Sequence, residues 1–509
     1  MAAGRPCRRA AGLDQRKHAS RRRGHDFAFD LALNRPILSW LGVSSPTRFA
    51  PPPRRDDPPT ASTAIRTDAA RTRSYHERMT SDAKPQMPST PALHASHDVL
   101  IVGGGLVGAS LAIALDRLGL DVGLIEAAPP GALPAVFDER NLSFAEATLN
   151  ALGALGVLAK LRAPTGSIQR IHISRRGDFG RTVLDAQRYG REEFGRIVVA
   201  RDFGEALEAR LAELPRLHRY RPVRFVGLAD DADPGWRAIR VADGAGERIL
   251  RARLVVAADG TRSGVRDALG IAADEYDYGQ TLFVTRLRSE RAPDGTAYER
   301  LGDDGPTALL PRGDRHYGFI HGVANAQADA VAALDEAGFL ARAQDAFGWR
   351  AGRFVSCGAR SLYPAIRVLA ARTIAPRAVL VGNAAQTIHP IGAQGFNLGL
   401  RDAMTLAELI EHDLAAGAEK ADCGSADLLE RYAQRRKPDR DRTVEFSDGI
   451  ARLASNETAL MRPLRSLGLF ALDRMPTAQS LLVGGAMGYR GDVPALCRGD
   501  EPMLRGGRA

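Results

Sequence analysis

Three glycines at a fixed spacing form the first motif that can bind a cofactor. Gly103, Gly105 and Gly108 follow the apolar run DVLIV and open the helix-like segment LVGASLAIALDRLG. In such a turn the first glycine permits the tight bend, the second lets the backbone approach a pyrophosphate, and the third lets the helix pack on the strand. Glu126 ends the next apolar run, where a carboxylate can bind ribose hydroxyls. We therefore predict a dinucleotide site, although this motif alone does not separate FAD from NAD.

Two further motifs place charged side chains beside apolar runs. Arg140 lies in DERNLSF, where it can pair with phosphates, cover a flavin edge or belong to a surface charge cluster. Asp259 and Gly260 end the run ARLVVAADG, and Arg266 follows where a helix is expected to begin. Asp259 can cap that helix, or it can line the path of a pyrophosphate or nicotinamide. From the residues alone, each motif can have either a structural role or a binding role.

A fourth motif, VGNAAQTIHPIGAQGFNLGLRDA, is rich in glycine around a single proline. Asn383 follows an apolar run and can hydrogen-bond a ribityl hydroxyl. Pro390 and the neighbouring glycines, Gly395 among them, let the backbone lie against a flat ring. A helix expected to begin near Gly395–Asn397 would point its N-terminus at the ligand, and such a terminus stabilises negative charge. The motif therefore favours a ring such as reduced flavin, which carries negative charge.

The elements that must position these motifs alternate between strand and helix. DVLIV, the helical segment after it and DVGLIEA form a β-α-β unit, which implies a parallel sheet. Strand-like runs such as IQRIHIS, TLFVTRLR and HYGFIHGV lie between the later parallel segments, and residues 424–489 are mostly helical in pattern. We predict an α/β fold in which a Rossmann-like nucleotide-binding core is interleaved with an antiparallel sheet.

The motifs, in this order and spacing, resemble those of the class A flavin monooxygenases typified by p-hydroxybenzoate hydroxylase. FDERNLSFAEATLNALGALGV, IHISRRGDFGRTVLDA and GNAAQTIHPIGAQGFNLGLRDA are most similar to the ubiquinone-biosynthesis hydroxylases, and within them to the 2-polyprenyl-6-methoxyphenol hydroxylase group. The resemblance covers roughly residues 97–492. It implies an FAD-binding domain from residues 97–166, 191–274 and 376–412, a substrate-binding sheet domain from 167–190 and 275–375, and a helical C-terminal region from 413–509.

The resemblance also implies roles for individual residues. Those expected to bind the cofactor are Gly103, Gly105, Gly108 and Glu126 (ADP half of FAD), Arg140 and Arg201 (cofactor contacts), Asp259, Gly260 and Arg266 (FAD and NAD(P)H), Asn383 (ribityl), and Pro390, Gly395, Phe396 and Asn397 (isoalloxazine). The chain departs from the family in two places. Asn383 replaces the Asp of the wider class, but its side-chain oxygen still accepts hydrogen bonds. Ala393 stands where glycine is usual and would cost about 1 kcal/mol if that position needs a positive φ.

The implied activity is hydroxylation of a polyprenylated phenol with O2, using bound FAD reduced by NAD(P)H. No catalytic base can be assigned. His389 is next to Pro390, but a loop histidine with backbone hydrogen bonds is at least as good an interpretation. Two alternatives remain: a class A hydroxylase for another aromatic substrate or ring position, and a non-catalytic prenyl-lipid-binding flavoprotein scaffold in a biosynthetic complex.

Charge and composition limit the classes of partner that the chain can bind. Residues 1–78 hold fifteen Arg, one Lys and seven Asp or Glu, so nine of the ten net positive charges lie there and the remainder is nearly neutral. We therefore expect no nucleic-acid partner. The four cysteines are far apart and the histidines show no metal-ligand spacing such as H-E-x-x-H, which predicts a reducing cytoplasm and no metal.

The first 96 residues are expected to form a disordered basic extension. Three interpretations are open: translation that begins at Met79 or Met87, a true disordered tail, or a targeting peptide. No run of 18 apolar residues exists, so we predict no transmembrane span. NETALMRPLRSLGLFALDRM has apolar residues on one helical face with Arg462 and Arg465 nearby, which suggests peripheral contact with the inner face of the cell membrane or ordinary helix packing.

Overall fold

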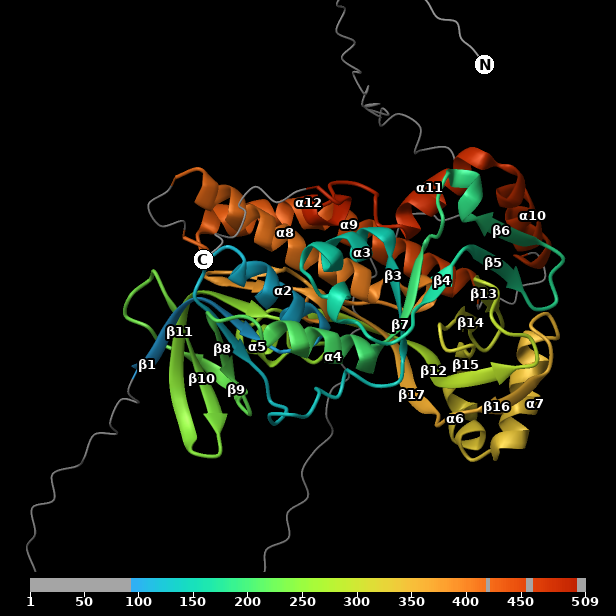
Figure 1. The fold of residues 1–509 in the computed structure, drawn as a ribbon, viewed down its shortest axis with the longest axis horizontal. Helices are drawn as coiled ribbons and strands as arrows, with labels where there is room; N and C mark the ends of the chain where they lie inside the picture. The colour runs from blue at the N-terminus through green and yellow to red at the C-terminus, as the bar shows by residue number, and fades with distance from the viewer. Residues whose placement is uncertain (1–92, 418–421, 455–460, 501–509) are drawn as a thin grey trace, which may run out of the picture. The chain divides into compact units, whose positions relative to one another are not determined.

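The computed structural model describes residues 93–417, 422–454 and 461–500 (Figure 1). The predicted basic extension was given as residues 1–96: residues 1–92 lie outside the described residues, and residues 93–96 belong to the first strand, β1 (Leu93–Val102). The helices are α2 (Leu106–Asp116), α3 (Glu146–Ala154), α4 (Ala200–Leu211), α5 (Gly264–Ala268), α6 (Asn325–Ala332), α7 (Glu336–Phe347), α8 (Gly395–Ala415), α9 (Ala426–Ala454), α10 (Met461–Arg474), α11 (Pro476–Ala486) and α12 (Ala495–Arg498). Short 3-10 turns are η1 (Leu158–Lys160), η2 (Ala186–Tyr189), η3 (Gly382–Ala384) and η4 (Ile391–Ala393).

The first sheet has eight strands and a parallel centre. Its strands are β1 (Leu93–Val102), β2 (Val122–Ile125), β8 (Leu217–Tyr220), β9 (Arg224–Ala229), β10 (Arg237–Asp243), β11 (Gly246–Ala257), β18 (Ile374–Ala375) and β19 (Ala378–Leu380). The order is β18-β19-β11-β1-β2-β8, with β9 and β10 joined antiparallel beside β11. The neighbours β19, β11, β1, β2 and β8 run parallel, so their carboxyl ends meet at one edge.

Burial on both faces explains why the central strands are continuously apolar. Val99 and Ile101 of β1 pack into the core formed with α2, α4, α8 and α9. Leu100 and Val102, which point the other way, pack into a second core with β9, β10 and α5. A strand whose alternate side chains enter two cores has no exposed face, and its sequence is therefore an unbroken hydrophobic run.

The second sheet has nine strands. They are β5 (Arg170–Arg175), β6 (Arg181–Asp185), β12 (Ala273–Ser289), β13 (Thr296–Leu301), β14 (Thr307–Pro311), β15 (Tyr317–Ala324), β16 (Phe354–Cys357), β17 (Ser361–Ala370) and β20 (Gln386–Thr387). All neighbours pair antiparallel except β13 and β5, which run parallel. Helices α6 and α7 pack on this sheet through a phenylalanine-rich core.

A small third sheet and the C-terminal helices complete the fold. The small sheet consists of β3 (Asn141–Ala145), β4 (Gly166–Ile168) and β7 (Gly195–Val199). Helix α9 packs on α8, and α10 packs on β6 at the far side of the second sheet (Figure 1). The predicted α/β fold, with a Rossmann-like domain interleaved with a second, mainly antiparallel sheet and a helical C-terminal region, is confirmed. None of the helices in the described ranges combines the length and apolarity of a membrane span.

Candidate active site

The glycine motif forms a close-packed turn at the carboxyl end of β1. Gly103 has φ +107°, and a Cβ there would lie 2.5 Å from the carbonyl oxygen of Ala258. A Cβ on Gly108 would lie 2.0 Å from the carbonyl oxygen of Gly103, so α2 can approach the turn only with glycine at this position. The N-cap of α2 is Gly105, and no side chain caps the helix. The N–H groups of the first turn are therefore not capped from within the chain and can bind an anion.

Glu126 lies directly beside this turn. It follows β2, and its Oε2 accepts a hydrogen bond from the Gly104 N–H at 2.9 Å, while Oε1 accepts from the Ala128 N–H at 2.7 Å. The carboxylate is thus fixed against the glycine turn from the neighbouring strand. This is the arrangement in which a carboxylate can reach ribose hydroxyls of a nucleotide on the α2 N-terminus.

Asp259 and Gly260 follow β11, the other neighbour of β1. Ser263 Oγ donates to Asp259 Oδ1 at 2.5 Å, and the Val265 N–H donates to Oδ2 at 3.1 Å. Asp259 therefore stabilises the first turn of α5, which was one of its two interpretations from sequence. Burial raises the pKa of this carboxyl. Gly260 has φ +86°, and a Cβ there would contact nothing within 4 Å, which leaves open space beside the turn.

Arg266 joins two loops of the same edge. Its side chain is buried, and Nη1 donates to the carbonyl oxygens of Thr261 and Ala384 at 3.1 and 3.3 Å. Ala384 belongs to η3, the turn that also contains Asn383. The guanidinium thus ties the turn after β11 to the turn after β19, while Asn383 itself is exposed.

The strand register shows why these motifs converge. Val102 of β1 is paired with Ala257 of β11, and Ala257 is paired with Leu380 of β19. The residues that follow these three positions begin the three loops, so segments more than 100 residues apart in the chain lie side by side. The fourth motif then continues into β20 of the second sheet, which places it where the two sheets meet.

The loop before α8 has two consecutive left-handed residues. Gly392 has φ +73°, and Ala393 has φ +52°. Pro390 is exposed, and a Cβ on Gly395 would contact nothing within 4 Å. Helix α8 starts at Gly395 without a side-chain cap, so a second open helix N-terminus lies in this region. The position of Ala393 does need a positive φ, and the alanine is strained there.

Replacing Ala393 with glycine is expected to stabilise the chain by about 0.5–1 kcal/mol, because relief of the left-handed strain exceeds the extra entropy of an unfolded glycine. The denaturant midpoint of urea unfolding checks this. Ala416→Gly is the matched control, since Ala416 directly follows α8 with φ −70° and the variant should lose stability instead. If both variants lose stability, the strain at Ala393 is not real.

Asn397 and Phe396 hold the start of α8 against its neighbours. Asn397 is buried and makes four hydrogen bonds: Oδ1 accepts from the Ala145 N–H and Thr148 Oγ1 at 3.0 and 2.7 Å, and Nδ2 donates to the Ser143 and Ala393 carbonyls at 2.9 and 3.0 Å. Its side chain is therefore fully used within the chain. Phe396 packs on the rings of Phe144 and Phe203.

His389 is a buried loop histidine. Nδ1 accepts the Ile391 N–H at 3.2 Å, and Nε2 lies 3.5 Å from Gln280 Oε1. Ser447 Oγ donates to the His389 carbonyl at 2.8 Å. Burial lowers the pKa of His389 to about 4, so the ring is neutral at physiological pH. These contacts agree with the interpretation of His389 as a loop histidine that makes backbone hydrogen bonds.

Arg140 and Arg201 are each paired with an acidic side chain. Arg140 Nε donates to Asp138 Oδ1 at 2.9 Å, and its guanidinium lies 4.6 Å from the centre of the Tyr363 ring. Burial would raise the pKa of Asp138, but hydrogen bonds from Arg140 and Tyr363 hold it below its usual range. Arg201 is half exposed and forms an ion pair with Glu139.

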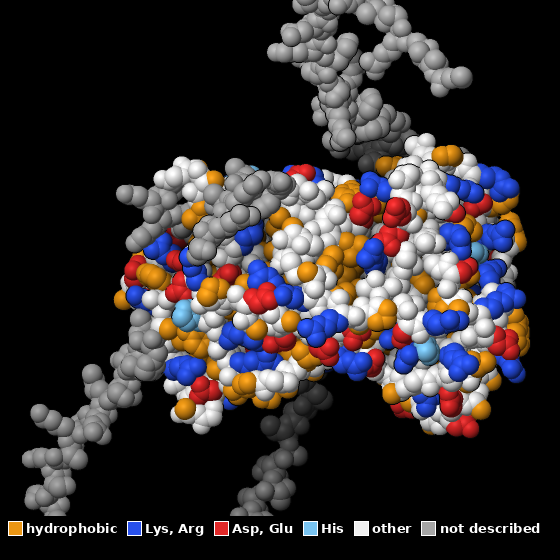
Figure 2. Space-filling model, viewed as in Figure 1, with side chains coloured by type: hydrophobic (Ala, Val, Ile, Leu, Met, Phe, Trp, Pro, Cys, Tyr) orange, Lys and Arg blue, Asp and Glu red, His pale blue; other side chains and the backbone are white. Residues whose placement is uncertain are grey.

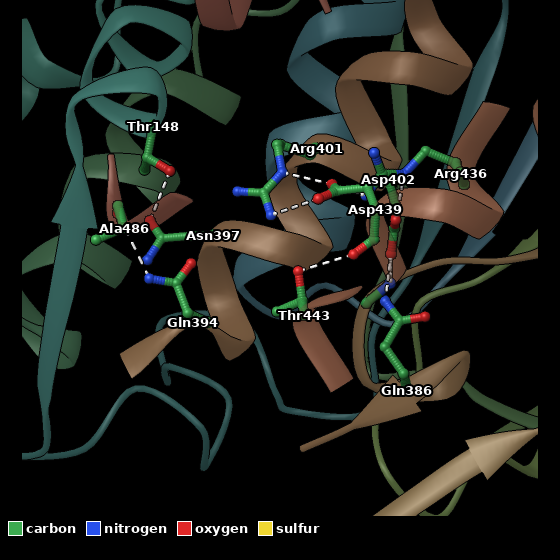
Figure 3. A network of polar contacts seen from close by, with 11 residues as sticks. Thr148, Gln386, Gln394, Asn397, Arg401, Asp402, Arg436, Asp439, Thr443 and Ala486 are labelled. Atoms are coloured by element: carbon green, nitrogen blue, oxygen red, sulfur yellow. Dashed lines mark hydrogen bonds and ion pairs between the residues drawn. The ribbon is translucent and has the colours of Figure 1, made fainter. Parts of the chain in front are cut away.

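A buried charge network supports the fourth motif, and sequence reasoning did not identify it (Figure 3). Asp402 Oδ2 accepts from the Gly382 N–H at 3.1 Å and from Gln386 Nε2 at 2.6 Å, which fixes both ends of the turn around Asn383. Arg436 of α9 donates to Asp402 Oδ1 at 2.7 Å and to Asp439 Oδ2 at 2.8 Å.

Arg401 completes this network. Its Nε donates to Asp439 Oδ2 at 2.8 Å. The only signal in the sequence was a pair of charged residues, Arg401 and Asp402, inside the otherwise apolar start of α8. Such a pair inside a buried helix requires partners, but the sequence does not tell which residues supply them.

Acid is expected to weaken this network. Burial would raise the pKa of Asp439, but Arg401 and Arg436 lower it below the usual range. A carboxyl whose pKa is lower when folded contributes stability above its unfolded pKa, about 3.9, and loses it as the pH falls through the folded value. Urea unfolding between pH 7 and pH 3 should show a steep loss of stability below about pH 4 that is smaller in Asp439→Asn. Equal losses in both proteins would contradict this.

The geometry fits an FAD cofactor. Two helix N-termini without side-chain caps, α2 and α8, lie beside the three loops. They are close together, because a Cβ on Gly399 of α8 would lie 2.9 Å from Gly382 Cα and 3.0 Å from a methyl of Val107 in α2. One terminus suits a pyrophosphate, and the other suits a ring that becomes anionic.

Comparisons with known proteins agree with this geometry. The FAD binding domain family matches residues 96–447. Ubiquinone hydroxylase UbiL of Rhodospirillum rubrum is 34% identical over 424 residues, which are 82% of this chain and 95% of the relative. The 3-demethoxyubiquinol 3-hydroxylase of Escherichia coli is 29% identical over 384 residues, which are 74% of this chain and 95% of the relative.

Solved structures share the fold. The p-nitrophenol 4-monooxygenase PnpA from Pseudomonas putida covers 78% of this chain with 99% of its own length, at a TM-score of 0.65 and 19% identity. PqsL from Pseudomonas aeruginosa, described as a probable FAD-dependent monooxygenase, covers 74% of this chain with its whole length, at a TM-score of 0.61 and 22% identity. The chain belongs to the FAD binding domain family, as an FAD-dependent monooxygenase of the ubiquinone-hydroxylase kind with NAD(P)H as co-substrate.

Proposed function

We propose that this monooxygenase hydroxylates the ring of a polyprenylated phenol in ubiquinone biosynthesis, with 2-polyprenyl-6-methoxyphenol as its substrate. The observation that carries the proposal is the convergence of the glycine turn, the Asp259 turn and the Asn383 loop at one sheet edge in a chain whose relatives are named ubiquinone hydroxylases. When bound, FAD reduced by NAD(P)H supplies the activation of O2. The chain holds the cofactor, orients the phenol and keeps water out.

Each part of the site then has a binding role. The α2 N-terminus with Gly103, Gly105 and Gly108 holds the pyrophosphate, and Glu126 exchanges one of its backbone hydrogen bonds for a ribose hydroxyl. Exposed Asn383 binds the ribityl chain, and Asp259, Gly260 and Arg266 shape the turn beside it. The α8 N-terminus at Gly395 stabilises negative charge on the ring.

The remaining predicted residues either hold the loop in place or contact the cofactor. Asn397 and Phe396 hold α8 in place, and Pro390 presents the loop backbone to the flat face of the ring. Arg140 and Arg201 contact the cofactor in this proposal, and both must leave or share their present carboxylate partners to do so. No base is assigned, because neutral His389 is committed to backbone and ring contacts.

A small pocket of about 60 Å³ lies beside this loop, and in this proposal it marks where the isoprenoid tail enters. Its wall includes Gln394 of the loop, Phe446 of α9, and Leu481 and Leu482 of α11, but also the charged side chains of Arg401, Asp439, Arg442 and Arg490. Leu481 is also exposed at the surface. For an apolar tail to run from the surface of α11 toward the start of α8, the pocket must widen between Phe446 and the two leucines.

We also propose peripheral contact with the inner face of the cell membrane, and the exposed apolar side chains of α10 support it. Leu464, Leu467 and Phe470 lie three residues apart on α10 and are exposed, and Arg474 lies over the Phe470 ring. Arg465 was suggested as a headgroup contact, but this was wrong: it is buried and lies 3.7 Å from Asp178. The rest of the surface seen in Figure 2 mixes acidic and basic side chains.

Replacing Leu464 and Leu467 together with glutamate should weaken binding to vesicles that contain anionic lipids at least about tenfold. Each leucine that leaves the bilayer loses about 1.5–3 kcal/mol of burial. Co-flotation with vesicles measures the bound fraction, and Trp349→Ala is the control because Trp349 is exposed elsewhere. Unchanged flotation of the double variant would remove α10 as the contact surface.

A cell that lacks the chain should accumulate the phenol that it hydroxylates, which tests the substrate directly. Accumulation of 2-polyprenyl-6-methoxyphenol supports the proposal. Accumulation of a later precursor favours the second candidate, which is hydroxylation at another ring position. The name of the Escherichia coli relative, 3-demethoxyubiquinol 3-hydroxylase, supports this candidate. An unchanged precursor pattern would contradict both candidates.

A further inference from the structure

Three side chains of types that can bind a metal lie together on or next to the neighbouring strands β1, β2 and β8. His97 is in β1, Asp121 precedes β2, and His218 is in β8. One potential ligand atom from each lies within 4.8 Å of the others. His97 Nδ1 is 2.8 Å from Asp121 Oδ1, and His218 Nε2 is 3.3 Å from the same oxygen.

The parallel register produces this cluster. β2 lies between β1 and β8, and His218 is paired with Gly123 of β2. A Cβ on Gly123 would lie 3.1 Å from Cδ2 of His97, so a side chain there would crowd the imidazole. The glycine lets the two imidazoles approach across the middle strand, with ring centres 5.0 Å apart.

We propose that His97, Asp121 and His218 bind a divalent transition-metal ion, with Zn²⁺ as the ion that this ligand set suits best. Two imidazole nitrogens and a carboxylate oxygen are common zinc ligands, at about 2.0–2.2 Å. In a tetrahedral site with such bonds the ligand atoms are about 3.3 Å apart. The His218–Asp121 separation already has that value, and the His97–Asp121 separation of 2.8 Å must lengthen by about 0.5 Å.

Tyr220 supplies the outer contact that a histidine ligand requires. Its hydroxyl lies 2.6 Å from His97 Nε2. When Nδ1 binds the metal, Nε2–H donates to the tyrosine oxygen, which fixes both the tautomer and the ring orientation. Without metal, Nδ1–H donates to Asp121 and the tyrosine hydroxyl donates to Nε2. Metal binding therefore changes the His97 tautomer: the ring proton is on Nε2 instead of Nδ1, the ring stays neutral, and the hydrogen bond to Tyr220 is reversed.

Two of the three side chains are exposed, so an ion can reach the cluster from solvent. The His97 side chain is buried, whereas the side chains of Asp121 and His218 are 45% and 58% exposed. Water can occupy the remaining coordination position from the solvent side. The cluster is about 20 Å from Gly103, since six residues of extended strand separate them. The ion would thus link three strands of the FAD-binding sheet at the edge opposite the cofactor, and its role is structural.

The test measures zinc binding by the untagged full chain in competition with a chromophoric chelator. Wild type and His412→Gln, which removes an exposed histidine outside the cluster, should bind one equivalent tightly. His218→Gln and Asp121→Asn should bind it at least about tenfold more weakly. Zinc should also raise the Tm of wild type and His412→Gln by a few degrees. It should leave the Tm of His218→Gln and Asp121→Asn unchanged.

Two results would overturn the proposal. One is equal zinc affinity in wild type and His218→Gln. The other is that wild type binds no zinc ion tightly. The FAD content of each variant shows that it is folded. Because the cluster lies away from the cofactor edge, we expect His218→Gln to keep its FAD, so the outcome does not depend on the substrate proposed above.

Discussion

Purified Gly108→Val protein is expected to contain almost no FAD, whereas the parent protein should contain about one FAD per chain. The added side chain starts at a position only 2.0 Å from the Gly103 carbonyl oxygen and 3.1 Å from Ala258 Cβ. Helix α2 must then move away from β1, and its N-terminal N–H groups leave the pyrophosphate position. We expect FAD affinity to fall by a factor of at least about 100, a loss of about 3 kcal/mol.

Absorbance of the bound flavin, with FAD quantified after denaturation, measures this result. Gly449→Ala is the matched control, since a Cβ on Gly449 would contact nothing within 4 Å. The control should keep its full FAD content. Normal FAD content in Gly108→Val would show that the glycine turn does not hold the cofactor.

Arg436→Met should destabilise the protein by about 3–5 kcal/mol, the range for removing one partner of a buried ion pair. Arg436 is nearly inaccessible, and it lies between the buried carboxylates of Asp402 and Asp439. Methionine has similar length but leaves Asp402 without its cationic partner from α9. Because Asp402 also fixes the turn around Asn383, we expect FAD to dissociate more readily as well.

Thermal and urea unfolding of the FAD-free proteins measure the loss of stability. Arg431→Met on the same helix is the control, since Arg431 pairs with Asp413 and Asp427 at the surface. Exposed pairs of this kind contribute at most about 1 kcal/mol. Similar losses in the two variants would mean that the buried network is not what stabilises the contact of α8 and α9.

Local patterns allowed much of the fold to be predicted. The run DVLIV, the glycine spacing and the helical segment after it predict β1, the turn and α2, because each depends on neighbours in the sequence. Gly103, Glu126 and Asp259 do lie at one sheet edge, since parallel strands bring their carboxyl ends together. The resemblance raised a positive φ at Ala393 only as a condition, and the structure meets it with φ +52°.

Contacts between distant segments could not be predicted. The partner of Asp402 is 34 residues away on another helix, and the four hydrogen bonds of Asn397 reach β3 and α3. The His97, Asp121 and His218 cluster depends on strand register, so its spacing of 24 and 97 residues resembles no metal motif. The parallel pairing of β13 with β5 is likewise a result of tertiary structure.

The most direct test of the central claim is mass spectrometry of the reaction product. FAD-loaded protein would be incubated with NAD(P)H, O2 and a short-tailed 2-polyprenyl-6-methoxyphenol. The account predicts a phenol heavier by one oxygen atom, with that atom derived from labelled O2 and formed in proportion to the NAD(P)H consumed. Recovery of the phenol unchanged, with FAD bound and NAD(P)H available, would contradict it.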